Sequence, residues 1–151
     1  MRYVYWDSVC FLGWLQDEED KSSVCEQVLI EADAGKTTIV TSALTIAEVL
    51  MVKRQAPITK DKRDLVQSFF KRDYIEIRSV TRRLAEHARE LVWDAGIDPK
   101  DAIHVATAIG ADLNEIHTFD GPLTTAVNQI NGGKLRACRP YVEQGDFLGR
   151  A

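Results

Sequence analysis

The chain has 151 residues, of which 45% are hydrophobic and 28% charged, and it carries a net charge of -4. This length and composition predict one domain with a hydrophobic core. No apolar run reaches the roughly 18 residues of a membrane span, and no signal-peptide core precedes Asp7, so we expect a cytoplasmic protein with no membrane partner.

Strands and helices alternate through the first half of the chain. Ser42 can cap one helix that breaks before Pro57, and Thr59 can cap the next. The predicted elements are, in chain order, a strand at 2–6, a helix or turn beginning at 11–15, a helix from about 22 to 34, a strand at 37–42, and helices at 43–55 and 60–72.

The second half continues the alternation. Thr81 begins a helix that ends before Gly96, and the Asp98-Pro99 pair is a strong start for the next helix. The predicted elements are a strand at 74–80, helices at 81–95 and 99–111, a strand at 114–119, a short helix at 122–130 and an edge strand at 134–138.

This order of elements predicts an α/β fold with a mainly parallel sheet and helices on both faces. We expect one domain over residues 1–142 and a poorly anchored C-terminal tail over 143–151. Such sheets bind ligands outside the carboxyl ends of their strands. The three cysteines are widely spaced and odd in number, which excludes a disulfide framework and a zinc knuckle.

Four acidic residues lie far apart in the chain, each at the edge of an apolar segment: Asp7, Glu48, Asp101 and Asp120. Unpaired carboxylates are costly where a chain becomes buried, so their recurrence predicts a shared counter-ion. Asp7 and Asp120 close predicted strands, and Asp101 lies in the first turn of a helix, where the dipole favours an ionised carboxylate. Glu48, about two turns into its helix, must reach the same rim from there.

The chemistry of these ligands selects the ion. Two unit charges about 4 Å apart repel by roughly 4 kcal/mol at an effective dielectric constant near 20, so clustered carboxylates need a cation. Oxygen ligands without a paired histidine or cysteine favour Mg2+ or Mn2+. Such an ion can activate water and polarise a phosphoryl oxygen, which is the chemistry of phosphodiester hydrolysis without a separate general base.

Each acid also has a purely structural explanation. Asp7 could cap a helix, and Asp101 could complement a helix dipole. Asp120 could belong to a turn, and Glu48 could face solvent. The four together, in this order and with their flanking residues, are stronger evidence than any one of them.

The four acids stand in four short motifs: Asp7-Ser8, Ala47-Glu48-Val49-Leu50, Asp101-Ala102-Ile103-His104 with Ala106-Thr107-Ala108, and Thr118-Phe119-Asp120. With these motifs the chain resembles the PIN domain family over nearly its whole length, in particular the small VapC-type ribonuclease toxins of toxin-antitoxin modules. The third motif is the most specific. The Val9-Cys10 pair departs from the small polar and aliphatic residues that the family often has there.

The resemblance implies a three-layer α/β/α sandwich and an endoribonuclease that uses Mg2+ or Mn2+ to cleave single-stranded or structured RNA. It also implies a homodimer and inhibition by a small antitoxin protein. The ion would be held by Asp7, Glu48, Asp101 and Asp120, with Ser8 and Thr118 orienting the carboxylates through hydrogen bonds. His104 receives no catalytic role, because a lone helical histidine more often packs or caps.

A basic segment follows the second acid. It holds Lys53, Arg54, Lys60, Lys62 and Arg63, opposed only by Asp61. Such a segment could hold RNA phosphates, although a solvated helix face is the better explanation for any single basic residue.

Two other functions fit parts of the sequence. A receiver domain of the response-regulator type also has acids at strand ends and a Mg2+ ion. That fold needs a phosphoacceptor aspartate at the end of a central strand and a lysine at the end of a later one, and neither TTIVTS nor IHTFD supplies them. A catalytically silent PIN-like module that only binds RNA or protein fits better, since acids can be retained without turnover.

Overall fold

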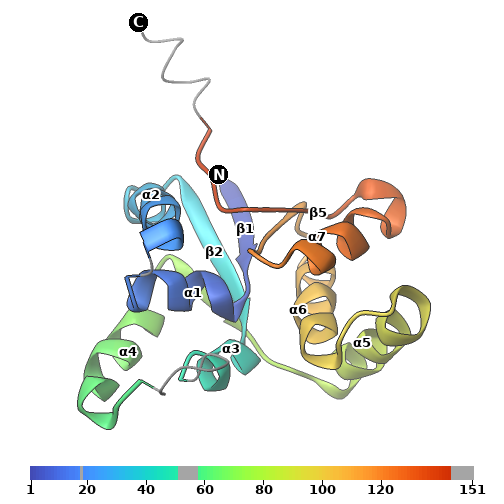
Figure 1. Cartoon of the computed structure of the whole chain (residues 1–151), viewed down its shortest axis with the longest axis horizontal. Coiled ribbons are helices and arrows are strands. Elements are labelled where there is room, and N and C mark those ends of the chain that lie inside the picture. The colour runs from blue at the N-terminus through green and yellow to red at the C-terminus, as the bar shows by residue number, and fades with distance from the viewer. Residues whose placement is uncertain (18, 51–57, 144–151) are drawn as a thin grey trace, which may run out of the picture.

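The computed structural model describes residues 1–17, 19–50 and 58–143. Its centre is a five-stranded sheet in the order β3-β2-β1-β4-β5, and every pairing is parallel. The strands are β1 (Arg2–Trp6), β2 (Thr37–Ser42), β3 (Ile75–Arg78), β4 (Glu115–His117) and β5 (Arg136–Cys138). Helices lie on both sides of the sheet (Figure 1), which confirms the predicted three-layer α/β/α sandwich.

One face of the sheet packs on α1 (Ser8–Leu15), α2 (Glu19–Asp33) and α4 (Arg63–Phe70). Alternate residues of β1 point to this face, and Val4 and Trp6 are fully buried in it. Phe11 of α1 contacts Trp6 edge to face, with ring centroids 5.1 Å apart. Each such side chain contributes about 1.5–3 kcal/mol through burial.

The other face packs on α5 (Arg82–Ala95), α6 (Pro99–Gly110) and α7 (Gly121–Asn128). Tyr5 and Ile116 are fully buried on this side. They are partners across the parallel β1–β4 pair, so their side chains point the same way. Successive side chains of a strand point to opposite faces of the sheet, and both faces pack on helices, so the short strands are apolar on both faces.

Local capping chemistry explains where the helices begin and end. The Ser42 hydroxyl accepts from Leu44 N–H, and the Thr81 hydroxyl accepts from Leu84 N–H. Asp98 accepts from Lys100 N–H at the start of α6. Gly96 ends α5 with φ 65°, in the left-handed region that favours glycine.

Several predicted boundaries need correction. The helix predicted over 43–55 is α3 (Ala43–Glu48), so Glu48 is its last residue and not an interior one. The Leu50 carbonyl accepts a hydrogen bond from Ile58 N–H. In a longer helix this carbonyl would instead accept from an N–H one turn further along the same helix. Residues 51–57 lie outside the described residues.

Other differences are smaller. The helix predicted over 60–72 is a 3-10 turn, η1 (Lys60–Lys62), followed by α4, and α2 begins at Glu19, within the acidic run. Acids are favourable in a first helical turn, and this offsets the absence of an apolar stripe there. A second 3-10 turn, η2 (Asn131–Gly133), lies between the helix predicted at 122–130 and the edge strand predicted at 134–138.

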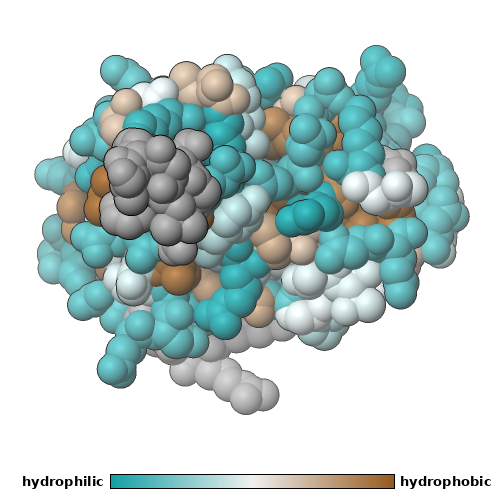
Figure 2. Space-filling view, turned by 90° about the horizontal axis from the view of Figure 1, so that it is seen from above, coloured by the Kyte–Doolittle hydropathy of each residue, from teal (hydrophilic) through white to brown (hydrophobic). Residues whose placement is uncertain are grey.

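The strand order determines where a ligand can approach. From β1 the chain moves to β2 and β3 on one side, and it then crosses to β4 and β5 on the other. The carboxyl ends of β1 and β4 therefore flank the switch point, the usual ligand crevice of such sheets. Figure 2 shows the opposite rim, at the amino ends of the strands, where hydrophilic side chains predominate. Within the described ranges, no helix is long and apolar enough to cross a bilayer.

Candidate metal centre

Asp7 lies at the carboxyl end of β1, and its side chain is buried among the elements that meet there. It is the N-cap of α1, and its Oδ1 accepts from Cys10 N–H at 3.2 Å. Burial raises the pKa of the Asp7 carboxyl, although His104 and the nearby Thr118 hydroxyl lower it in part. The capping role explains the fold of this segment, and the buried negative charge remains to be neutralised.

Asp120 follows β4 across the switch point and caps α7. Its Oδ1 accepts from Leu123 N–H at 2.9 Å. The Thr118 hydroxyl accepts from Asp120 N–H at 3.2 Å and also lies close enough to Asp7 to lower its pKa. Thr118 therefore links these two aspartates, at the position where we expected it to orient a carboxylate.

Asp101, in the first turn of α6, shows that the aspartates share one electrostatic environment. Its pKa is raised to about 6, chiefly by burial, while His104 acts in the opposite direction. The charges of Asp7, Asp120 and the neighbouring Asp98 raise it further. Two aspartates far away in the sequence, Asp7 and Asp120, thus lie near enough to act on the carboxyl of Asp101.

Glu48 reaches this region, where one of its carboxylate oxygens contacts His104. Its Oε1 lies 2.6 Å from Nε2 of His104, and its side chain is 19% exposed. Within the described part of the chain, no three of the four acids bring their oxygens within 4.8 Å of one another. Mg2+ takes only one or two carboxylates directly and keeps several waters, so this open spacing suits a hydrated ion.

The chain matches the family model described as "PIN domain" over residues 4–124. This chain belongs to the PIN domain family. The match spans the segments that carry all four acids, and the receiver alternative is therefore wrong. None of the curated proteins matches the chain.

Two solved structures share the fold of this PIN domain. VapC20 of Mycobacterium tuberculosis, described as a toxin that cleaves the sarcin-ricin loop, aligns with a TM-score of 0.66 and 16% identity, over 82% of this chain and 94% of that one. A toxin-antitoxin complex from Klebsiella pneumoniae aligns with a TM-score of 0.62 and 20% identity, over 93% of this chain and 99% of that one.

The other predicted site residues of the PIN domain are partly placed. Lys60, Lys62 and Arg63 are exposed on η1 and the start of α4, on the same lower side of Figure 1 as α3. Lys53 and Arg54 lie outside the described residues. Ser8 is half-buried at the first position of α1, and no side-chain hydrogen bond ties it to another described residue.

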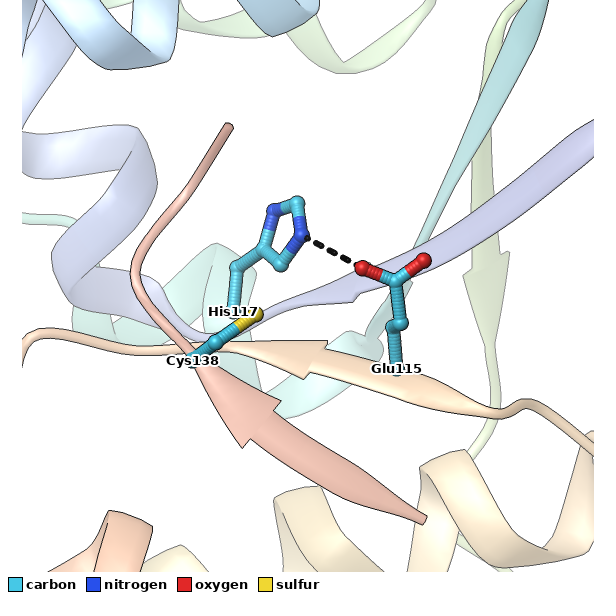
Figure 3. Close-up of side chains that lie close together, drawn as sticks. All are labelled: Glu115, His117 and Cys138. Atoms are coloured by element: carbon cyan, nitrogen blue, oxygen red, sulfur yellow. Dashed lines mark hydrogen bonds and ion pairs between the residues drawn. The ribbon is translucent and has the colours of Figure 1, made fainter. Parts of the chain in front are cut away.

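A second cluster of donor atoms, which includes none of the four acids, lies on β4 and β5 (Figure 3). Donor atoms of Glu115, His117 and Cys138 all lie within 4.8 Å of one another. Our sequence analysis excluded zinc-type motifs from the spacing along the chain, and it missed this grouping because Cys138 comes from the neighbouring strand. The question is whether the three donors are available to a metal ion.

The hydrogen bonds of His117 argue against a metal here. Trp6 Nε1–H donates to His117 Nδ1 at 3.1 Å, and burial lowers the pKa of His117, so the single ring proton lies on Nε2. That nitrogen faces Glu115 Oε1 at 3.4 Å. A ligating histidine has the reverse arrangement, with a bare nitrogen toward the metal and an N–H toward an acceptor. Arg2 Nη2 lies 3.2 Å from Glu115 Oε1 and already neutralises that carboxylate, so the cluster is a structural polar network.

This assignment predicts a pH-dependent contribution to stability. Burial alone would raise the pKa of Glu115, but hydrogen bonds from His117 and Arg2 outweigh it and lower the pKa to about 2. The stabilisation is present above the ordinary pKa of a glutamate and is lost as the pH falls toward 2. Glu115→Gln is expected to reduce the free energy of unfolding by about 1 kcal/mol at pH 7 and by less at pH 3. Urea denaturation measures this, and an equal loss at both pH values would contradict it.

Proposed function

We propose that this protein is a metal-dependent endoribonuclease that hydrolyses RNA phosphodiester bonds as the toxin of a toxin-antitoxin module. The observation that carries the proposal is that Asp7 and Asp120, which follow the two strands at the switch point of the sheet, both act on the carboxyl of Asp101. Neighbouring carboxylates of which one, Asp7, is buried have a use for a hard divalent cation, and membership of the PIN family supports that use.

Asp7, Glu48, Asp101 and Asp120 would hold Mg2+ or Mn2+. When bound, the ion supplies charge neutralisation, a more acidic water and polarisation of a phosphoryl oxygen. The protein groups do the rest: Asp7 and Asp120 are fixed by backbone N–H groups, and Thr118 spans the two. Since caps hold these carboxylates before any ligand arrives, little reorganisation is needed on binding.

The substrate carries phosphates, and an acidic protein needs local positive charge to retain it. The exposed side chains of Lys60, Lys62 and Arg63, together with Lys53 and Arg54, are the residues that we propose for this role. The proposal assigns these side chains to the RNA backbone and not to base recognition.

Replacing Lys60, Lys62 and Arg63 together with alanine is expected to weaken RNA binding and to flatten its salt dependence. Each phosphate contact on a single strand contributes about 0.7 to the slope of log affinity against log salt, so the slope falls by about 2. Fluorescence anisotropy with labelled RNA at several salt concentrations measures both effects. Lys36→Ala, an exposed lysine just before β2 on the opposite rim, is the control and should leave the slope nearly unchanged. Equal slopes in all three proteins would remove this surface from the proposal.

The fold likeness to VapC20 and to a toxin-antitoxin complex supports a small antitoxin protein as the partner, and we propose a homodimer as the working assembly. Cleavage of an RNA pool in Mg2+ or Mn2+, with Asp101→Asn as control, tests the activity. A PIN domain that binds RNA without cleaving it would leave the pool intact. Co-purification with the product of a neighbouring gene tests the partner.

A further inference from the structure

His104 connects three segments of the chain at the candidate metal centre. It lies on α6, one turn after Asp101, and only 1% of it is exposed. Its Nδ1 is 2.6 Å from the Tyr5 hydroxyl on β1, and its Nε2 is 2.6 Å from Glu48 Oε1 at the end of α3. Both ring nitrogens are therefore engaged, and both contacts are short.

The chemistry of the partners assigns the proton on each side of the ring. A bare Nε2 would direct its lone pair at a carboxylate oxygen 2.6 Å away, so Nε2 carries a proton and donates to Glu48. Burial, with the charge of Asp7, raises the pKa of Tyr5, so its hydroxyl remains protonated and donates to Nδ1. The resulting chain runs from Tyr5 through His104 to Glu48.

Glu48 depends on such support for the position of its carboxylate. α3 has only six residues, and Glu48 is the last of them. The backbone of α3 is anchored, since the Thr45 hydroxyl lies 2.8 Å from that of Thr41 and Val49, directly after the helix, is fully buried. The carboxylate of Glu48 itself has His104 as its hydrogen-bond partner among the described residues. With Oε1 held on the imidazole, Oε2 is the oxygen left to face a ligand.

The same imidazole acts on the aspartates. His104 is the group that most lowers the pKa values of Asp7 and of Asp101, which indicates that its ring lies near both carboxylates. A residue that contacts Glu48 and lies beside the aspartates can determine the direction in which the glutamate points relative to them.

We propose that His104 is a positioning residue: held by Tyr5, it fixes one oxygen of Glu48 and turns the other toward the pocket of Asp7 and Asp101. This assignment rests on the proposed metal-dependent function. It explains why a helix as short as α3 can supply a metal-binding carboxylate, and it predicts that affinity for the ion depends on a residue that does not touch the ion.

The test compares His104→Leu, which removes both hydrogen bonds, with His104→Gln, whose amide keeps a donor near the position of Nε2. The readout is Mn2+ affinity, measured by isothermal titration calorimetry without RNA, alongside thermal unfolding. We expect His104→Leu to weaken Mn2+ binding by about 10- to 100-fold and His104→Gln to recover most of that loss. RNA cleavage by His104→Leu should fall and should be partly restored by raised Mn2+, because the defect lies in holding the ion.

Two further variants separate positioning from packing. Tyr5→Phe keeps the ring volume and removes only the hydroxyl, so it is expected to fold and to weaken Mn2+ binding several-fold. His117→Gln changes another buried histidine with two hydrogen bonds, and it should lower stability without changing Mn2+ affinity.

The outcomes are distinct. If wild type binds Mn2+ and cleaves RNA while His104→Leu and Tyr5→Phe bind Mn2+ as tightly as wild type, His104 is a packing residue and the positioning role is overturned. The same conclusion follows if His104→Gln is as defective as His104→Leu. If wild type itself neither binds Mn2+ nor cleaves RNA, the proposed function fails and the positioning role fails with it.

Discussion

Asp101→Asn is expected to reduce RNA cleavage by roughly a thousandfold while making the metal-free protein more stable. The loss of activity follows because a bound metal ion contributes several kcal/mol of charge stabilisation, and each 1.4 kcal/mol corresponds to a factor of ten. The gain in stability follows because the pKa of Asp101 is raised to about 6, so its ionised form disfavours the folded state at neutral pH. Asparagine has a similar shape and no charge to bury.

These opposite effects distinguish a functional residue from a structural one. Cleavage rates in Mg2+ or Mn2+ and thermal unfolding in EDTA measure them on the same samples. Asp98→Asn is a matched control: Asp98 lies three residues earlier, is exposed, and caps α6, a role that asparagine also fills. It should change neither quantity much. Wild-type cleavage by Asp101→Asn would remove the mechanism, and a lower stability would show that Asp101 is held for structural reasons.

The parts of this site that local chemistry determines could be predicted from the sequence. Asp7 and Asp120 follow apolar strands and cap the next helices. Their place after a strand therefore predicts that they lie at the carboxyl end of the sheet. Asp101 follows an Asp-Pro helix start, which fixes its place in the first turn. Each of these positions depends on neighbours within a few residues.

The remaining features depend on contacts between distant segments. The apolar pattern after Glu48 predicted a helix to residue 55, whereas α3 ends at Glu48. His104 was set aside as a packing residue, because neither Tyr5 nor Glu48 is near it in the sequence. The Glu115, His117 and Cys138 cluster likewise requires the pairing of β4 with β5. Strand order and side-chain direction carry this information, and neither can be read from spacing along the chain.

Metal binding and pH are expected to be coupled, so that Mn2+ stabilises the protein much more at pH 7.5 than at pH 5. The folded-state pKa values of Asp7 and Asp101 both lie above their ordinary values, chiefly because of burial. Between about pH 4 and pH 6 these two carboxyls therefore bind more protons in the folded protein than in the unfolded chain, and their contribution to stability falls as the pH rises. Above pH 6 Asp101 is ionised, so the carboxylates around it attract a cation more strongly.

Thermal unfolding in EDTA and in excess Mn2+, measured from pH 4 to pH 8, tests this coupling. At a free Mn2+ concentration 100 times the dissociation constant, the gain at pH 7.5 is about 2.7 kcal/mol, and it shrinks toward pH 5 as protons compete for the carboxylates. Glu115 and His117 also titrate in this range or near it, with effects of the opposite sign, so the informative quantity is the difference between wild type and Asp101→Asn. That difference should grow from pH 4 to pH 6 in EDTA, because only wild type carries the Asp101 charge. Parallel curves for the two proteins, or an equal effect of Mn2+ at pH 5 and pH 7.5, would mean that these carboxylates do not form a common site for the ion.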